Sequence, residues 1–215
     1  DLSNAFLQKW PQRLDAARRD LGQYDIPYRI QPDAKQVLIV GAGGGNDVAG
    51  ALRHGVEHVT AVEIDPGIVQ LGRAYHPEAP YADPRVTVVV DDARAFFRRQ
   101  GARYDVISFG LLDAHTQSSS YNNTRIDHYV YTVESFREAR ERLNEQGILT
   151  VSFESPRLWI AGRIGANLKE AFGSEPVAFR VPAGHYGWGG TLFVCARDPE
   201  RLRRLIHNDL VLDRF

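Results

Sequence analysis

The sequence lacks several features that would point to particular classes of protein. It has no methionine and a single cysteine, Cys195, so no disulfide can form within the chain. No apolar run approaches the roughly 20 residues that a membrane-spanning helix needs. No signal-peptide pattern opens the chain either. These absences favour a reducing compartment, and we expect a cytoplasmic location.

Methionine is missing even at the first position, which is Asp1. We therefore expect the chain to be a piece of a longer protein. What the remainder carries stays open, and one alternative is a membrane anchor. In that case the chain would be the soluble domain of a membrane-associated protein.

The chain also lacks an excess of charge of either sign. Its 26 lysines and arginines oppose 27 aspartates and glutamates, which gives a formal net charge of -1. A general nucleic-acid-binding surface needs a basic excess, so we expect no such binding. The 215 residues, 43% of them hydrophobic, suit one α/β domain, and a homodimer is left open.

What the sequence does contain is a regular alternation of strand-like and helix-like segments. The expected strands cover 36–40, 58–64, 85–90, 104–109 and 147–153. The expected helices cover 47–54, 66–76, 93–100 and 132–144. Such alternation with short connections predicts a parallel sheet with helices on both faces.

Further segments extend this pattern at both ends of the chain. A helix at 157–172 is followed by an antiparallel pair of strands at 176–182 and 191–197, and then by a helix at 198–208. The prediction is an α/β fold with a mostly parallel seven-stranded sheet and an antiparallel edge hairpin. We divide the chain into an N-terminal helical segment, 1–35, and a main domain, 36–215, within a single domain overall.

A glycine-rich turn, "VGAGGGND", follows the first expected strand. Its glycines Gly41, Gly43 and Gly45 let the backbone approach a ligand closely, and the next helix offers unpaired N–H groups. Ligands of open α/β sheets bind at this carboxyl end of the strands. A dinucleotide fingerprint places its third glycine one position later, which disfavours a nicotinamide-dependent oxidoreductase. A purely structural turn is the alternative.

Carboxylates follow the second and third expected strands. Glu63, with Asp65 after it, stands where a carboxylate can accept hydrogen bonds from both hydroxyls of a ribose. The run Asp91, Asp92 and Ala93 places an acid where it can accept from an adenine amine. The alternatives are a capping or solvated role for Glu63 and a helix N-cap for the aspartates. Since the loop has no basic residue, the set predicts a nucleoside site without a pyrophosphate.

Six segments carry a resemblance to a known family: "VLIVGAGGG", "VTAVEIDPGIVQLGRAY", "DPRVTVVVDDARAFF", "YDVISF", "VYTVESFREARERLNEQGILTVSF" and "GWGGTL". Together, over 36–197, the chain resembles the Rossmann-like class I S-adenosylmethionine-dependent methyltransferase sandwich. More narrowly, it resembles the spermidine synthase (aminopropyltransferase) branch. The resemblance implies that the glycine loop and Glu63 hold the adenosine end of S-adenosylmethionine or its decarboxylated form. It also implies that Asp92 lies near the adenine.

The sequence departs from that branch in positions tied to polyamines. The aspartate that meets the donor's ammonium in the glycine loop is matched by Gly44, and an acid there would repel the carboxylate of intact S-adenosylmethionine. The aspartate after the fourth strand is matched by Gly110, which we count with the cofactor-binding residues. The branch's β-rich N-terminal subdomain is absent. Gly44 favours methyl transfer, whereas the overall resemblance favours aminopropyl transfer, so both stay open.

Two residues after the fourth expected strand are candidate bases for the transfer. Asp113 matches a second acidic position of the branch, and His115 lies two residues on. The alternatives are a turn-capping role for Asp113 and a solvated His115. The candidate substrate residues, which can instead pack in the core, are Tyr121, Tyr131, His185, Tyr186 and Trp188.

The leading hypothesis is an S-adenosyl-dependent transferase that moves a methyl or aminopropyl group to a small polar or amine acceptor. The loss of the aspartate at Gly110 and the missing start motivate an alternative. In that alternative the chain is a non-catalytic nucleoside-binding module of a larger protein.

Overall fold

The computed structural model describes residues 22–99, 101–112, 129–154, 158–181, 189–209 and 212. Residues 1–21 of the expected N-terminal helical segment lie outside the described residues. So do the polar stretch from 113 to 128 and the tip of the edge hairpin from 182 to 188.

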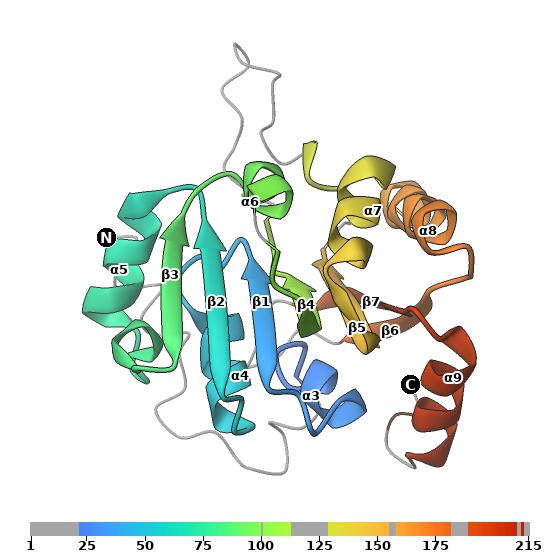
Figure 1. Ribbon diagram of the computed structural model, residues 1–215, viewed down its shortest axis with the longest axis horizontal. Helices are drawn as coiled ribbons and strands as arrows, with labels where there is room; N and C mark the ends of the chain where they lie inside the picture. The colour runs from blue at the N-terminus through green and yellow to red at the C-terminus, as the bar shows by residue number, and fades with distance from the viewer. Residues whose placement is uncertain are drawn as a thin grey trace.

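Seven strands form one sheet in the order β3-β2-β1-β4-β5-β7-β6 (Figure 1). The strands are β1 (Gln36–Val40), β2 (His58–Glu63), β3 (Val86–Val90), β4 (Tyr104–Phe109), β5 (Leu143–Phe153), β6 (Val177–Val181) and β7 (Gly190–Ala196). The first five strands are parallel, and β7 pairs antiparallel with both β5 and β6. The predicted mostly parallel seven-stranded sheet with an antiparallel edge is confirmed.

Helices cover both faces of this sheet. They are α3 (Ile26–Ile30), α4 (Asn46–Arg53), α5 (Pro66–Tyr75), the 3-10 turn η1 (Pro80–Ala82), α6 (Ala93–Arg99), α7 (Val133–Glu141), α8 (Leu158–Phe172) and α9 (Pro199–Asn208). Along β1, Val37 and Ile39 join the hydrophobic cluster that includes α3, α4 and α9. Leu38 and Val40 join the cluster that includes α6, α7 and α8. Because successive strand residues face opposite sides, burial on both faces explains the uninterrupted apolar run.

Side-chain caps fix the starts of three helices where the sequence shows Asp or Thr. Asp65 accepts from the N–H of Gly67 at 2.8 Å and opens α5. Thr132 accepts from the N–H of Ser135 at 3.2 Å and opens α7, and Asp198 caps α9. In α7, Thr132 is therefore the N-cap and Ser135 supplies the N–H donor.

The helix expected over 132–144 is wrong at its end, because α7 stops at Glu141 and β5 already begins at Leu143. Leu143 is fully buried and pairs with Tyr104 of β4. Gly147 of β5 lies so close to β4 that a Cβ on it would stand 2.9 Å from the carbonyl oxygen of Tyr104. Strand pairing over a long sequence separation therefore overrides the local helical pattern here.

The short helix α3 lies within the N-terminal segment, 1–35, that we expected to be helical. Its residues Ile26, Tyr28 and Ile30 are buried in the cluster that also holds β1 and α4. The part of the N-terminal segment that the structure describes, 22–35, therefore packs in the same core as the main domain. Across the described ranges, no helix combines the length and the apolar character needed to cross a membrane.

Candidate functional site

The glycine loop between β1 and α4 lies at the carboxyl edge of the sheet, where β1, β2 and β3 end side by side (Figure 1). Gly41, Gly43 and Gly45 have φ angles of 69, 53 and 104°, in the left-handed region that favours glycine. A Cβ on Gly44 would meet no atom within 4 Å. The loop is therefore folded by three of its glycines, and the fourth faces open space.

Side chains from other elements hold this loop in place. The N–H of Gly43 donates to Oε2 of Glu63 at 2.8 Å, and the hydroxyl of Tyr81 donates to the carbonyl of Gly43 at 2.7 Å. Gly72 of α5 packs against the loop, since a Cβ there would stand 2.6 Å from the carbonyl oxygen of Gly44. Both sides of the loop backbone are thus fixed before any ligand binds.

His76 braces the start of α4 beneath the loop. Its Nδ1 accepts from the N–H of Glu78 at 3.1 Å, so the proton lies on Nε2, which donates to Oδ1 of Asn46 at 3.1 Å. Burial lowers the pKa of His76 to about 4. The ring is therefore neutral at physiological pH, and its hydrogen bond to Asn46 holds the first residue of α4 in place.

Glu63 is buried, with 7% of its surface exposed, and lies at the tip of β2. One oxygen accepts from Gly43, and the other, Oε1, accepts from the N–H of Asp65 at 3.0 Å. Glu63 is therefore not solvated, and the cap of α5 is Asp65 instead. Because each carboxylate oxygen can accept more than one hydrogen bond, both oxygens of Glu63 can still accept from hydroxyl donors of a ligand.

The tip of β3 is joined to the same place, because the N–H of Asp91 donates to the carbonyl of Glu63 at 3.0 Å. Asp92 accepts from the N–H of Ala95 at 2.9 Å and caps α6, which begins at Ala93. Asp91 accepts from the N–H of Asp92 and pairs with Arg99. The N-cap alternative is confirmed for Asp92, and contact of these residues with an adenine stays a prediction.

The end of β4 is more crowded than the loop. Gly110 is buried, and its N–H donates to the carbonyl of Val40 at 3.0 Å. A Cβ on Gly110 would stand 2.8 Å from the carbonyl oxygen of Gly41 and 3.1 Å from Oδ2 of Asp47. The side chain of Leu112 lies over Gly41. Close packing therefore excludes any larger residue at 110, whereas position 44 has room for one.

Asp47, in the first turn of α4, was placed in a helix from sequence but not recognised as part of the site. Only 8% of it is exposed, and its Oδ1 accepts from the hydroxyl of Ser108 at 3.3 Å. Burial raises the pKa of Asp47 to about 7, with a smaller contribution from Asp25, whereas the hydrogen bonds from Ser108 and from its own backbone N–H lower it. The available signal was an acid directly after "GGGN", at the N-terminal end of a helix that faces the sheet.

Tyr131 packs against the hydrophobic core, which was the alternative to a substrate-binding role. Its ring meets Phe153 edge-on with centroids 5.5 Å apart, and its carbonyl accepts from Nδ2 of Asn167 at 3.0 Å. The other predicted catalytic and substrate residues lie outside the described residues: Asp113, His115, Tyr121, His185, Tyr186 and Trp188.

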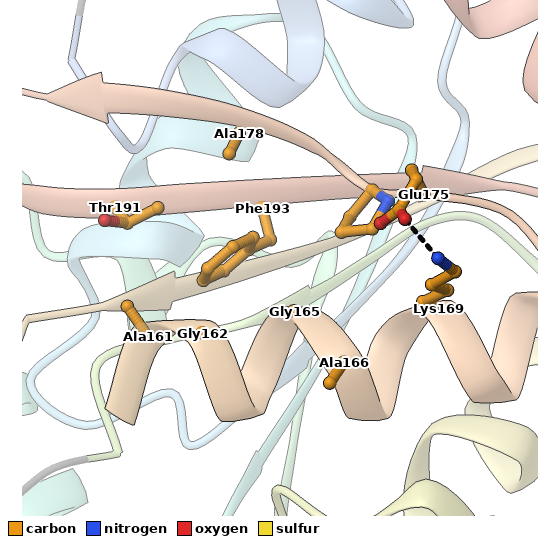
Figure 2. Close-up of a pocket in the computed structure, with 10 residues that line it drawn as sticks. Ala161, Gly162, Gly165, Ala166, Lys169, Glu175, Ala178, Thr191 and Phe193 are labelled. Atoms are coloured by element: carbon orange, nitrogen blue, oxygen red, sulfur yellow. Dashed lines mark hydrogen bonds and ion pairs between the residues drawn. The ribbon is translucent and has the colours of Figure 1, made fainter. Parts of the chain in front are cut away.

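A groove of about 520 Å³ lies elsewhere, between α8 and the strands β6 and β7 (Figure 2). Small side chains of α8 line it opposite Thr191 and Phe193, and the ion pair of Lys169 with Glu175 stands at one end. None of the loop or strand-tip residues described above lines this groove. It is therefore separate from the predicted nucleoside site. Within the described ranges, no cluster of His, Cys, Asp and Glu suits a metal ion.

The chain matches the family described as "Spermine/spermidine synthase domain" over residues 24–200. A polyamine aminopropyltransferase of Pectobacterium carotovorum is 31% identical over 185 residues, which cover 84% of this chain and 61% of that protein. The polyamine aminopropyltransferase of Saccharolobus solfataricus is 30% identical over 162 residues, covering 72% of this chain and 52% of that protein. The chain thus spans less than two thirds of the length of these relatives.

Solved structures show the same fold. Spermidine synthase from Thermotoga maritima has a TM-score of 0.66 and 21% identity, covering 87% of this chain and 64% of that one. Human methyltransferase-like protein 13, solved in complex with SAH, has a TM-score of 0.60 and 17% identity, covering 87% of this chain and 88% of that one. Both likenesses cover 87% of the chain, which agrees with the expected methyltransferase-type sandwich.

Proposed function

Because the chain belongs to the spermine/spermidine synthase family, we propose that it is the catalytic domain of an aminopropyltransferase. It transfers an aminopropyl group from decarboxylated S-adenosylmethionine to an amine acceptor. The named functions of its relatives favour this transfer over methyl transfer, the other reaction that the sequence left open. They also favour an enzyme over a non-catalytic nucleoside-binding module.

The observation that carries the proposal is the arrangement of Glu63. A buried carboxylate, fixed by the N–H groups of Gly43 and Asp65, keeps acceptor capacity at the edge where the glycine loop opens. A ribose diol offers two hydroxyl donors to such a group. Gly44 leaves space beside the loop for the sulfonium and its chain. The described residues therefore fit the adenosyl donor.

The reaction is a direct displacement. The acceptor's nitrogen forms a bond to the carbon next to the sulfonium while the carbon–sulfur bond breaks, and the electron pair of that bond goes to sulfur. The new secondary ammonium then loses one proton. The protein's task is to align the nitrogen with the carbon–sulfur bond and to take up the proton. Asp113 and His115, which lie outside the described residues, remain the proposed bases.

Product analysis tests the proposal. The chain is incubated with decarboxylated S-adenosylmethionine and a panel of small diamines and polyamines, and methylthioadenosine and the lengthened amine are measured by mass spectrometry. Parallel reactions with intact S-adenosylmethionine report methyl transfer as S-adenosylhomocysteine. We expect the first pair of products with at least one amine. Formation of S-adenosylhomocysteine alone would replace the proposal by methyl transfer, and tight donor binding without either product would support the non-catalytic module.

A further inference from the structure

Helix α5 carries an exposed apolar stripe along its outer side. Ile68, Leu71 and Tyr75 are 39, 58 and 58% exposed, and they follow one another at spacings of three and four residues. They therefore share one face of the helix, which we call the α5 stripe. Ile64 and Val90 are exposed as well, but they lie at the tips of β2 and β3 and belong to the predicted nucleoside site. Large apolar side chains gathered on one exposed face mark a contact surface.

The rest of the fold supports α5 with few contacts. Among its ten residues, all of them described, only Val69 and Gly72 are buried. Figure 1 shows α5 at the margin of the molecule, and no other described element stands beyond it. Gly72 lies against the glycine loop, because a Cβ there would stand 2.6 Å from the carbonyl oxygen of Gly44. A helix is stabilised chiefly by packing of its apolar face, so this wall of the loop lacks a cover on its outer side within the described residues.

The segment 1–21, which precedes the described residues, contains the same spacing of apolar residues. Spacings of three and four residues separate Leu7, Trp10, Leu14, Ala17 and Leu21. That is the heptad pattern of a helix that packs along another helix. Pro11 suits the first turn of a helix, so the pattern predicts a helix over 11–21. At 1.5 Å per residue, such a helix is about 16 Å long, and α5 is about 15 Å long.

The described chain begins close to the carboxyl end of α5. The side chain of Asn46 hydrogen-bonds Tyr24 on one side and Nε2 of His76, the C-cap of α5, on the other. The backbone of Tyr24 is held against α4, since a Cβ on Gly50 would stand 2.4 Å from the carbonyl oxygen of Tyr24. The segment 1–21 therefore joins the fold near this end of α5. A helix over 11–21 that lies on α5 runs parallel to it, with Leu21 nearest to Tyr75.

We propose that residues 11–21 dock along the outer face of α5 as a parallel helix. Leu14, Ala17 and Leu21 repeat the spacing of the α5 stripe, so the two helices can pair in three successive layers. The segment is covalently attached a few residues before Tyr24, and such a tether gives a high effective concentration that favours it over a second copy of the chain. The docked helix covers the stripe and braces the wall of the glycine loop. This inference goes beyond the proposed function and does not depend on it.

Disulfide trapping in the full chain tests the inference. Ala17→Cys is combined with Leu71→Cys, the chain is mildly oxidised, and the disulfide is located by peptide mass spectrometry. In the parallel register these two positions face each other, so we expect most chains to form an intrachain disulfide. The native Cys195 is only 3% exposed and does not compete for the new thiols.

The matched control combines Ala16→Cys with Leu71→Cys. Ala16 is the same type of residue one position earlier, on the outward side of the heptad. Because its Cβ points away from α5 in the docked helix, we expect this disulfide to form at least about 5-fold more slowly.

Hydrogen exchange gives a second measurement that needs no new cysteine. Leu71→Asp puts a charge in the middle of the α5 stripe, and the side chain is exposed enough for the fold to tolerate it. We expect the amides of 11–21 to exchange about 10-fold faster or more than in wild type, because the docked helix is released. Gln70→Asp introduces the same residue at an exposed position of α5 outside the stripe and should leave that exchange unchanged.

Equal trapping in the two cysteine pairs would overturn the inference, and so would exchange over 11–21 that Leu71→Asp leaves unchanged. Disulfides between chains would overturn it in favour of a second copy, above all if Leu71→Asp converts a wild-type dimer to a monomer in analytical ultracentrifugation. None of these measurements uses a donor or an acceptor. Their failure therefore leaves the proposed function intact.

Discussion

Two carboxylates at the same edge of the sheet are equally buried but differently supported. Glu63 at the tip of β2 and Asp47 beside the end of β4 are 7% and 8% exposed. Both oxygens of Glu63 accept from backbone N–H groups of other residues at 2.8 and 3.0 Å. Asp47 accepts from the hydroxyl of Ser108 at 3.3 Å and from its own backbone N–H. The two carboxylates therefore differ in the support that they receive, although both are buried to nearly the same extent.

The largest effect is expected from removing the better supported carboxylate. In Glu63→Gln, the amide nitrogen would face one of two N–H donors, Gly43 or Asp65, and leave it without an acceptor. We expect binding of methylthioadenosine and of the decarboxylated donor to weaken alike, by about 100-fold or more. Calorimetry measures this, with Glu57→Gln at the opposite edge as the control. A loss confined to the decarboxylated donor would erase the distinction between the two carboxylates.

Asp47→Asn should stabilise the fold at high pH. The pKa of Asp47 in the fold is about 7 against an ordinary 3.8, so its neutral form favours folding fully below pH 3.8, and this contribution is lost as pH rises to 7. Above pH 7 the variant should exceed wild type by on the order of 3 kcal/mol, and near pH 4 by little.

Urea unfolding at several pH values gives this difference directly. Asp25, Tyr24, Tyr28 and Tyr81 are the titratable groups coupled to Asp47, and none of them changes in the variant. A difference independent of pH, or a variant less stable at pH 8, would show that Asp47 is a balanced structural acid like Glu63.

A matched pair of glycine substitutions tests the space at the end of β4, at Gly110, and in the glycine loop, at Gly44. Gly110→Ala places a Cβ 2.8 Å from the carbonyl of Gly41, which should cost about 2 kcal/mol and lower the melting temperature by about 4–8 °C. Gly44→Ala places its Cβ in open space and should shift the melting temperature by no more than about 2 °C. Scanning calorimetry distinguishes the two, and similar shifts would contradict the packing described for the end of β4.

An effect smaller than that of Gly110→Ala is expected from Tyr81→Phe, which removes only the hydroxyl that donates to the carbonyl of Gly43 at 2.7 Å. Loss of one hydrogen bond should lower the free energy of unfolding by about 1 kcal/mol. Donor binding should weaken by only a few-fold, because Glu63 still holds the other side of the loop. Urea unfolding and calorimetry measure the two quantities, and a loss as large as that of Glu63→Gln would mean that Tyr81 is the principal support.

The fold and the geometry of the glycine loop could be predicted because their signals are local. The apolar run of 36–40 shows burial, the glycines at 41, 43 and 45 mark left-handed backbone, and Glu63 directly follows a strand. Each of these depends on a few neighbouring residues. The caps at Asp65 and Thr132 are local in the same way, because each accepts from a backbone N–H two or three residues further on.

The remaining features depend on contacts between distant segments. The start of β5 at Leu143 follows from its pairing with Tyr104, and no local pattern contains that information. Asp47 meets Ser108 across 61 positions of the chain. Its spacing from the glycine loop made it look like an ordinary residue of a helical first turn.

The sequence by itself determined the order of strands and helices, the glycine turn and the acid at the tip of β2, because backbone preference and burial periodicity act over short distances. Only the tertiary structure decided that Gly44 is open, that Gly110 is closed, and that a buried acid from α4 lies beside it. The free space and the neighbouring charges around a side chain depend on which distant segments of the chain pack against it. Those segments come together only when the sheet has formed.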